Sequence, residues 1–424
     1  MSTHAQDLLP SEWKSILRPI RDGLRDRFPS KPQSPPDLEN RRKRRELDAL
    51  KGFAYFEDFD EVDDWAPEDV DPLQRSSIPL LKRPELDDAS QQKARVLLCH
   101  DFAGNYHDYE SSAEHILGAE SYSCEYLQFV EAFVYFSHKL VCIPPPMWTN
   151  TLHRNGVKSL GTLLIEPGNI EIERLLVRQE ASNSQSPHFV VARQLANMAH
   201  IYEFDGWLLN LEKPFPSNKW DPFLLIEFIK QLRVDLGPAK QVVWYDALTI
   251  DNTVAYQNAL TKKNLSFTQA AGSMLTNYAW SNRSLSPSKN LALKNQIPPQ
   301  NIYFGIDVWA QNKQSGPHKR ITFPGKGGGG TNTGTAVGTL ALEGFSAGIF
   351  APAWSFEHFP GYERRIERTM WEGLELPAPL KCDCGESELH KQVYPQHPIV
   401  RWASEFPAGS ETFLFTKFKR AFQR

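Results

Sequence analysis

A strand, a helix and a second strand are predicted within GWLLNLEKPFPSNKWDPFLLIEFIKQLRVDLGPAKQVVWYDA (residues 206–247). The two ends, GWLLNLE (206–212) and QVVWYDA (241–247), are short apolar runs of the kind that form buried strands. Between them, DPFLLIEFIKQLRVDLG (221–237) repeats apolar residues at helical spacing. A strand, a helix and another strand in succession predict two parallel strands joined by a helical crossover.

The same alternation continues on both sides of this unit. Six further strands are predicted at VLLCHD (96–101), AFVYFS (132–137), SLGTLLIE (159–166), SMLTNYAW (273–280), IYFGIDVWA (302–310) and AGIFAPAW (347–354). Helices are predicted at WTNTLHRNG (148–156), FVVARQLANMAHIYE (189–203), NTVAYQNALTKKN (252–264), TAVGTLALEGF (335–345) and YERRIERTMWEGL (362–374). Eight such units in about 280 residues predict an α/β fold, a (β/α)8 TIM barrel, as the catalytic domain over residues 95–375.

The segments outside the barrel have different compositions. Residues 1–50 form a polar, Pro-rich and basic extension, for which we expect little regular structure. Residues 51–94 are expected to pack on the barrel. Residues 376–424 are expected to form a short C-terminal tail, with one strand at FLFTKF (413–418), that either packs on the barrel or starts a small β module. The basic run 41–45 fits a solvated helix face, with a nuclear-localisation or anion-binding patch as the alternative.

Composition excludes several classes of partner. The chain has 424 residues, of which 41% are hydrophobic and 12% aromatic, so its central part is globular. A net charge of −4 gives no reason to expect nucleic acid, and no apolar run approaches the ~18 residues that cross a membrane. The five cysteines form no disulfide framework and the N-terminus has no apolar signal core, which predicts a cytoplasmic location. The sequence predicts no oligomeric state.

In a TIM barrel, substrate-binding side chains lie where the strands end. The residues predicted there are His100, Asp101, Ser137, His138, Glu166, Asn210, Glu212, Tyr245, Asp246, Asn277, Tyr278, Trp280, Asp307, Trp309 and Trp354. Asn210 and Glu212 are two positions apart, so both face the barrel interior, about 6.6 Å apart. Aromatic residues also gather near these ends, as expected of a carbohydrate cleft whose flat rings stack on sugars. These rings are Trp244, Tyr245, Tyr256, Tyr278, Trp280, Trp309 and Trp354.

The pair of an amide and an acid suggests a particular glycoside chemistry. Cleavage of a glycoside needs a general acid, a role that Glu212 can fill, but an amide takes the place of the usual second carboxylate. A sugar with a 2-acetamido group can supply the nucleophile through its own carbonyl oxygen, and Asn210 can orient that group. The pair therefore predicts retaining cleavage of an N-acetylhexosamine.

Several stretches resemble glycoside hydrolase family 85, the endo-β-N-acetylglucosaminidases that cut between the two core GlcNAc residues of N-linked glycans. They are HDFAGNYH (100–107), FVYFSHKLVCIPPPMWTNTLHRNGVKSLGTLLIE (133–166), FDGWLLNLE (204–212), VVWYDALTIDNTVAYQNAL (242–260), TNYAW (276–280) and YFGIDVWA (303–310). The resemblance covers roughly residues 50–375.

The resemblance implies roles for three residues. Glu212 would act as acid and then base, Asn210 would hold the acetamide in its reactive form, and Tyr245 would hydrogen-bond near that group. It also implies N-linked glycans and glycoproteins as substrates, transfer to acceptor sugars as well as to water, and no cofactor. Tyr256 stands where we expect a Trp in this pattern. Family members carry β-sandwich modules behind the barrel, whereas residues 376–424 are too few for full modules.

Two alternatives remain open from the sequence. A chitinase-like hydrolase would need Asp at positions 208 and 210, which here hold Leu208 and Asn210. A non-catalytic glycan-binding barrel would not need the acid Glu212. Cys382, Cys384 and His390 lack the four-ligand spacing of a zinc site, so no metal is predicted. PGKGGGGTNTG (324–334) lacks phosphate-loop spacing and is predicted to be a loop that could gate the substrate.

Overall fold

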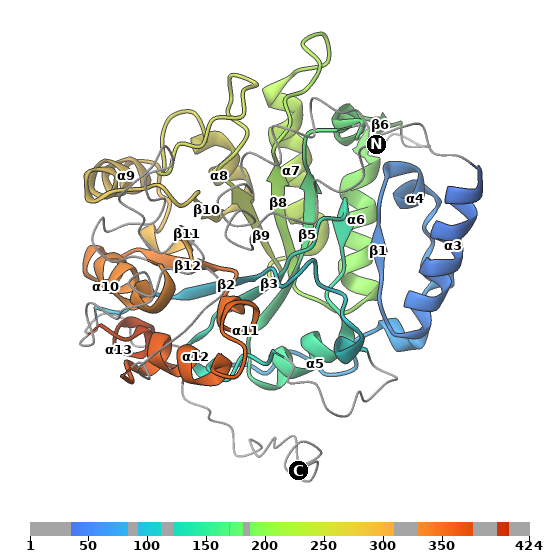
Figure 1. Cartoon of the computed structure of the whole chain (residues 1–424). Helices are drawn as coiled ribbons and strands as arrows, with labels where there is room; N and C mark the ends of the chain where they lie inside the picture. Colours follow the sequence, from blue (N-terminus) through green and yellow to red (C-terminus); the bar gives the residue numbers. More distant parts are fainter. Residues whose placement is uncertain are drawn as a thin grey trace, which may run out of the picture.

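Eight parallel strands close into a barrel in the computed structural model, which describes residues 35–83, 92–111, 122–168, 170–180, 187–308, 329–375 and 397–406. The strands are β2 (Val96–His100), β3 (Ala132–Tyr135), β5 (Lys158–Ile165), β8 (Gly206–Leu211), β9 (Gln241–Tyr245), β10 (Met274–Leu275), β11 (Ile302–Asp307) and β12 (Ser346–Phe350). Each pairs in parallel with the next, and β12 pairs with β2. Helices surround this barrel (Figure 1). The predicted TIM barrel and its eight strands are confirmed.

Strand β8 shows how the alternation of side chains builds the two cores. Trp207, Leu209 and Leu211 lie in the hydrophobic cluster that joins the barrel to the helices outside it. Leu208 lies in the cluster that fills the barrel interior, and Asn210 is two residues further along the same face. The prediction that Asn210 faces inward while its apolar neighbours face the helices is therefore confirmed.

Five of the predicted helices are present, each close to its predicted place. They are α5 (Pro146–Arg154), α6 (Val190–Ile201), α7 (Pro222–Leu236), α10 (Thr333–Glu343) and α12 (Glu363–Glu372). Two more helices, α8 (Leu265–Ala271) and α9 (Asn282–Lys294), complete the ring around the barrel, and short helices α11 (Trp354–His358) and α13 (Ile399–Trp402) follow β12. A second, two-stranded sheet pairs β6 (Arg178–Gln179) with β7 (His188–Phe189).

The helix predicted over 252–264 is wrong, because this segment is a loop between β9 and α8. Asn252 and Asn258 have φ of +58° and +54°, values that an α-helix cannot accommodate. The loop is held by side chains that bond to its backbone instead of by a helical ladder. Helical spacing alone could not reveal that competition.

The N-terminal part is more regular than the sequence indicated. Residues Pro35–Leu50 form helix α3, and the expectation of little regular structure is wrong for this stretch. Pairs one turn apart, such as Lys43 with Glu39, support the helix. Two arginines of the basic run point to α4 (Phe59–Asp64) and its flank: Arg41 contacts Glu57, Asp58 and Glu61, and Arg45 contacts Glu61. At least part of the run thus binds acidic side chains of this same chain.

The segment after α3 packs onto the barrel, as Figure 1 shows for β1 and α4. Strand β1 (Tyr55–Phe56) pairs antiparallel with β4 (Val141–Cys142), which in turn pairs with β5. Phe56, Phe59 and Val62 are buried in the same cluster as the barrel and its helices. Several connections contain short 3-10 helices: η1 (Pro67–Asp69), η2 (Pro72–Gln74), η4 (Asp108–Glu110), η5 (Leu127–Phe129), η6 (Ile172–Leu176), η7 (Pro299–Asn301) and η8 (Gly330–Asn332).

Several predictions concern residues outside the described part of the chain. These are the strand at 413–418, the cysteines 382 and 384, His390, and residues 324–328 of the Gly-rich stretch. Within the described ranges, no helix is both long and apolar enough to span a membrane. Cys99, Cys124 and Cys142 are buried, and none of these three forms a disulfide.

Candidate active site

The side chains of Asn210 and Glu212 meet at the mouth of the barrel. Asn210, near the end of β8, is only 4% exposed, and its Nδ2 donates a hydrogen bond of 3.3 Å to Oε1 of Glu212. The backbone N–H of Glu212 donates to the carbonyl oxygen of Ile165 at 2.7 Å, which ties the start of its loop to β5. The pair that sequence reasoning placed on one face is thus in direct contact.

The remaining amide oxygen of Asn210 is available to a ligand. Its Oδ1 atom is buried and has no hydrogen-bond partner among the residues that the structure describes. A buried acceptor without a donor loses on the order of 1–3 kcal/mol relative to its hydrated state. A ligand that brings an N–H group to Oδ1 would recover this free energy, so the amide favours ligands that carry such a donor.

Tyr245 lies next to this pair, at the end of β9. Its side chain is buried, and its pKa is raised well above the ordinary value, chiefly by burial and further by the nearby charges of Tyr278 and Glu212. Tyr245 and Tyr278 lie close enough for each side chain to affect the pKa of the other. A phenol held in its neutral form beside Glu212 can donate a hydrogen bond to a ligand over the whole physiological pH range.

Tyr278 is held from two sides. A side chain at Gly305 of β11 would meet the Tyr278 ring, with Cδ1 only 2.8 Å from a Cβ at that position, so the glycine makes room for the ring. On the other side, the ring centroids of Tyr278 and Phe350 are 5.4 Å apart. Burial raises the pKa of Tyr278, and the charge of Asp307, the last residue of β11, adds to the effect.

Two further aromatic residues, which were not predicted to bind substrate, line the apolar bottom of the barrel mouth. The ring centroids of Phe136, just beyond β3, and Phe350, at the end of β12, are 5.7 Å apart, and both residues belong to the barrel-interior cluster. The signal was present in the sequence, because both residues fall on the inward face of a predicted strand.

His138 and Glu166 form a second polar pair on the rim. Nδ1 of His138 lies 3.2 Å from Oε1 of Glu166, and both side chains are partly exposed. The imidazole packs edge-on against Phe136, with ring centroids 5.9 Å apart. Glu166 directly follows β5, the neighbour of β8, so this pair flanks the Asn210–Glu212 side of the mouth.

Tyr256 stands at the outer edge of the same region. It belongs to the loop after β9, its side chain is 41% exposed, and its ring centroid lies 6.3 Å from that of Tyr245. An exposed ring above a buried one is the arrangement expected of a wall against which a sugar can stack.

Three tryptophans that were predicted to bind substrate belong instead to the core. Trp244 is fully buried and packs on Phe267 of α8, because it faces away from the barrel interior that its neighbour Tyr245 enters. Trp280 and Trp354 are also buried, in the cluster outside the barrel. Trp309 lies outside the described residues.

The Gly-rich stretch is described only from residue 329 onward. Gly330 donates its backbone N–H to the carbonyl of Val308 at 2.7 Å, and buried residues 330–332 form η8 ahead of α10. This end of the stretch is therefore packed structure and not a loop, while the gating prediction concerns residues outside the described part. Among the described residues, no cluster of three metal-ligating side chains occurs.

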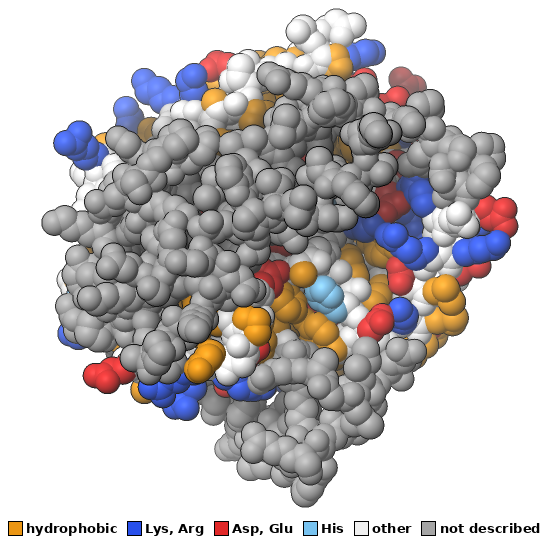
Figure 2. Space-filling model, viewed as in Figure 1, with side chains coloured by type: hydrophobic (Ala, Val, Ile, Leu, Met, Phe, Trp, Pro, Cys, Tyr) orange, Lys and Arg blue, Asp and Glu red, His pale blue; other side chains and the backbone are white. Residues whose placement is uncertain are grey.

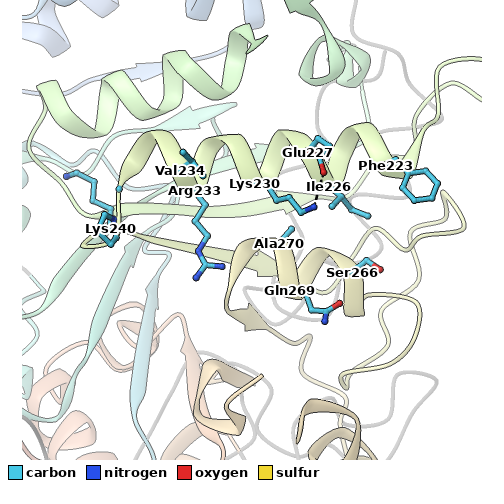
Figure 3. Close-up of a pocket in the computed structure, with 12 residues that line it drawn as sticks. Phe223, Ile226, Glu227, Lys230, Arg233, Val234, Lys240, Ser266, Gln269 and Ala270 are labelled. Atoms are coloured by element: carbon cyan, nitrogen blue, oxygen red, sulfur yellow. Dashed lines mark hydrogen bonds and ion pairs between the residues drawn. The ribbon is translucent and has the colours of Figure 1, made fainter. Parts of the chain in front are cut away.

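A cavity of about 890 Å³ lies elsewhere on the molecule, between α7 and α8 (Figure 3). Its lining includes Phe223, Lys230 and Arg233 of α7 and Gln269 of α8. These residues lie on the outer helices and include none of the strand-end side chains described above. The face drawn in Figure 2, by contrast, is hollowed near its middle, where a histidine lies beside apolar and acidic side chains.

Comparisons with known proteins agree with this geometry. A cytosolic endo-beta-N-acetylglucosaminidase from Gallus gallus is 31% identical over 326 residues, which cover 76% of this chain and 41% of that protein. Cytosolic endo-beta-N-acetylglucosaminidase 1 from Arabidopsis thaliana is 31% identical over 78% of this chain and 43% of that protein. This chain thus spans about two fifths of the length of these curated relatives.

A solved structure and a family model extend the comparison. The glycoside hydrolase domain of Spr0440, Endo-D, from Streptococcus pneumoniae R6 has a TM-score of 0.57 at 22% identity, covering 78% of this chain and 52% of that one, and so shares the fold. The model described as glycosyl hydrolase family 85 matches residues 106–424. The match covers well over half of the chain. The chain therefore belongs to glycosyl hydrolase family 85.

Proposed function

We propose that this chain is an endo-β-N-acetylglucosaminidase that hydrolyses the GlcNAc-β1,4-GlcNAc core of N-linked glycans. The carrying observation is the contact between Asn210 and Glu212, together with the unpartnered Oδ1 of Asn210. The names of the relatives from Gallus gallus and Arabidopsis thaliana support the same activity, and both are named as cytosolic proteins. We therefore also propose a cytoplasmic location, with N-linked glycans and glycoproteins as partners.

In the proposed first step, the substrate supplies its own nucleophile. The acetamide N–H of the donor GlcNAc donates to Oδ1 of Asn210, which turns the acetamide carbonyl oxygen toward C1. This oxygen forms a bond to C1 while the C1–O bond to the second GlcNAc breaks. Glu212 gives its proton to the departing oxygen, which leaves Glu212 as a carboxylate and the donor as a protonated oxazoline.

In the second step, water reopens the ring. The Glu212 carboxylate takes a proton from a water molecule, whose oxygen attacks C1 as the bond from C1 to the acetamide oxygen breaks. Two displacements at C1 retain its configuration. A sugar hydroxyl in place of water would give transfer, which we propose as a second activity. Burial keeps Tyr245 neutral, and we propose that its hydroxyl donates a hydrogen bond near the reacting acetamido group during both steps.

The proposed cleft is lined by the rim residues described above. Tyr278, Asp307, His138, Glu166 and Tyr256 are proposed to contact the glycan. Position 208 argues against a chitinase-like site, because Leu208 is a buried apolar residue of the barrel interior and supplies no carboxylate there. A purely binding barrel would gain nothing from the acid Glu212 next to the amide of Asn210.

The proposal is tested by incubating the protein with a high-mannose glycoprotein and measuring the mass of the glycosylated peptide. One GlcNAc left on the asparagine is the expected product. An asparagine converted to aspartate would indicate an amidase, and an unchanged glycopeptide from a folded, glycan-binding protein would indicate a binding module. Either of these outcomes would contradict the proposal.

A further inference from the structure

The loop between β9 and α8 carries Tyr256 and is anchored by one buried carboxylate. Asp246 directly follows β9 and is 1% exposed. Its Oδ1 accepts from the backbone N–H of Gln257 at 3.2 Å and from Nδ2 of Asn264 at 2.9 Å. Its Oδ2 accepts from the backbone N–H of Asn258 at 2.6 Å. These contacts hold the loop immediately after Tyr256 against the end of the strand that carries Tyr245.

The backbone around Tyr256 is fixed by further bonds within the loop. The N–H of Ala255 donates to the carbonyl of Ala247 at 3.0 Å, and Nδ2 of Asn258 donates to the carbonyl of Tyr256 at 3.1 Å. Asn258 also has a φ of +54°, which a residue other than glycine adopts only where its surroundings compensate for the strain. The carboxylate of Asp246 supplies that compensation, because it binds the N–H of Asn258 directly.

The loop is also joined to the segments on both sides of it. Asn252 clamps the backbone of Phe215, accepting from its N–H and donating to its carbonyl, both at 2.8 Å. Phe215 belongs to the loop that follows Glu212. Toward the other neighbour, Oδ1 of Asn258 accepts from the N–H of Ala279, next to Tyr278, at 2.7 Å. The loop therefore bridges the β8 and β10 sides of the mouth as one connected wall.

We propose that Asp246 is a positioning residue for glycan recognition: by anchoring residues 257–264, it holds Tyr256 as a fixed sugar-stacking wall above Tyr245. This inference rests on the proposed function, because it takes a glycan as the ligand. A ring that is already ordered loses little conformational entropy when a sugar stacks on it, so the anchor contributes to binding of the glycan and not to the chemical step. Asp246 is buried, and its side chain bonds to Gln257, Asn258 and Asn264, so we propose that it acts through the loop.

The test is a double-mutant cycle of Asp246→Asn and Tyr256→Ala, with Asp251→Asn as the control. Asp251 lies in the same loop, is exposed and pairs with Lys263, so its variant makes the same Asp-to-Asn change without touching Asp246 or its hydrogen bonds. In Asp246→Asn, a side-chain NH2 group would replace one carboxylate oxygen, and it cannot accept a hydrogen bond from the N–H group that it faces. The variant therefore loses part of the anchor but keeps the shape of the side chain. Hydrolysis of a glycopeptide and the melting temperature are measured for all variants.

We expect Asp246→Asn to raise KM about tenfold and to change kcat less than about twofold, and we expect the same of Tyr256→Ala. The double variant should be no worse than the poorer single variant, because the anchor acts only through the ring. The control should match the wild type in both constants. The proposal would be overturned if the two substitutions raised KM independently, so that their effects multiply in a folded double variant. An unchanged KM in Asp246→Asn would also overturn it.

Amide hydrogen exchange tests the anchor without relying on activity. In Asp246→Asn, the N–H groups of Gln257 and Asn258 should exchange about tenfold faster than in Asp251→Asn, because their acceptor is weakened. Unchanged protection would overturn the anchor even if the enzyme is active. A wild type that hydrolyses no glycopeptide would instead contradict the proposed function, and the exchange result would still decide whether Asp246 holds the loop.

Discussion

Asn210 donates its side-chain N–H to Oε1 of Glu212 at 3.3 Å, so the amide and the acid of the proposed site form one hydrogen-bonded unit. The contact fixes which amide atom remains for the substrate: Nδ2 is used by Glu212, and Oδ1 is left as an acceptor. This division explains why an asparagine, which has both a donor and an acceptor, suits position 210. Aspartate would place a second carboxylate against Glu212.

The acid can be tested by Glu212→Gln. Glutamine keeps the shape and can still contact Asn210, but it has no proton to give to the leaving oxygen. We expect hydrolysis of a glycopeptide to fall by about 10²–10⁴-fold, with an unchanged melting temperature. The control is Glu227→Gln, an exposed glutamate of α7 that pairs only with Lys230 among the described contacts. Substantial turnover by Glu212→Gln would refute its role.

Tyr245→Phe tests the phenol beside the pair. The ring would remain in the barrel-interior cluster, but the hydroxyl that burial keeps protonated would be absent. We expect kcat to fall by roughly 10–100-fold, since the loss of one preorganised donor weakens charge stabilisation at the reacting group. Steady-state kinetics with a glycopeptide measures this. A kcat equal to that of the wild type would show that the hydroxyl takes no part in the reaction.

The size of the ring at position 256 is expected to control transfer. Tyr256→Trp enlarges an exposed ring at the outer edge of the mouth, so an acceptor sugar has a larger surface on which to stack. We expect a larger share of the released glycan to appear on an added GlcNAc acceptor and a smaller share as free glycan. Product analysis at equal turnover compares the two proteins, and equal transfer yields would contradict this role.

A buried glutamate far from the site should make stability depend on pH. Glu367 of α12 is 1% exposed, and burial raises its pKa from 4.5 to about 8, only partly opposed by Arg364. The folded protein therefore holds this proton up to higher pH than the unfolded chain does. The stabilisation of the folded protein by protonated Glu367 is complete below about pH 4.5 and is lost as the pH rises toward 8.

Glu367→Gln removes that titration. From about pH 6 to about pH 8, the free energy of unfolding of the wild type should fall by roughly 2 kcal/mol relative to the variant, with a slope of about 1.4 kcal/mol per pH unit that flattens near pH 8. Urea denaturation at both pH values measures the difference, with Glu227→Gln again as the reference. Parallel pH profiles for wild type and variant would show that Glu367 is ionised in the folded protein.

The barrel was predictable because short apolar runs recur along the chain with segments of helical spacing between most of them. The inward position of Asn210 followed from the two-residue period of β8. The same period applied to β9 predicts that Trp244 faces the helices once Tyr245 faces the barrel interior. The prediction that Trp244 binds substrate was therefore avoidable. Trp280 and Trp354 are different, because β10 ends at Leu275 and β12 at Phe350, and beyond a strand end the period no longer applies.

The loops around the barrel mouth were harder to predict than the side chains on the strands. Residues 252–264 show helical spacing, yet Asp246 and Asn252 bond to backbone groups far along the chain or in another loop. Such bonds depend on how neighbouring strand ends come together, which only the closed barrel determines. For the same reason, the loop that carries Tyr256 could be named from the sequence but not given a shape.

The most direct test of the division of labour between Asn210 and Glu212 compares two substrates in Asn210→Ala. This variant should lose hydrolysis of a glycopeptide by at least about 10²-fold, because nothing then aims the acetamide at C1. It should still open a preformed glycan oxazoline at a measurable rate, since the assisted step is already complete and Glu212 remains as the base. A folded Asn210→Ala protein that hydrolyses the glycopeptide normally, or that cannot use the oxazoline, would contradict the account.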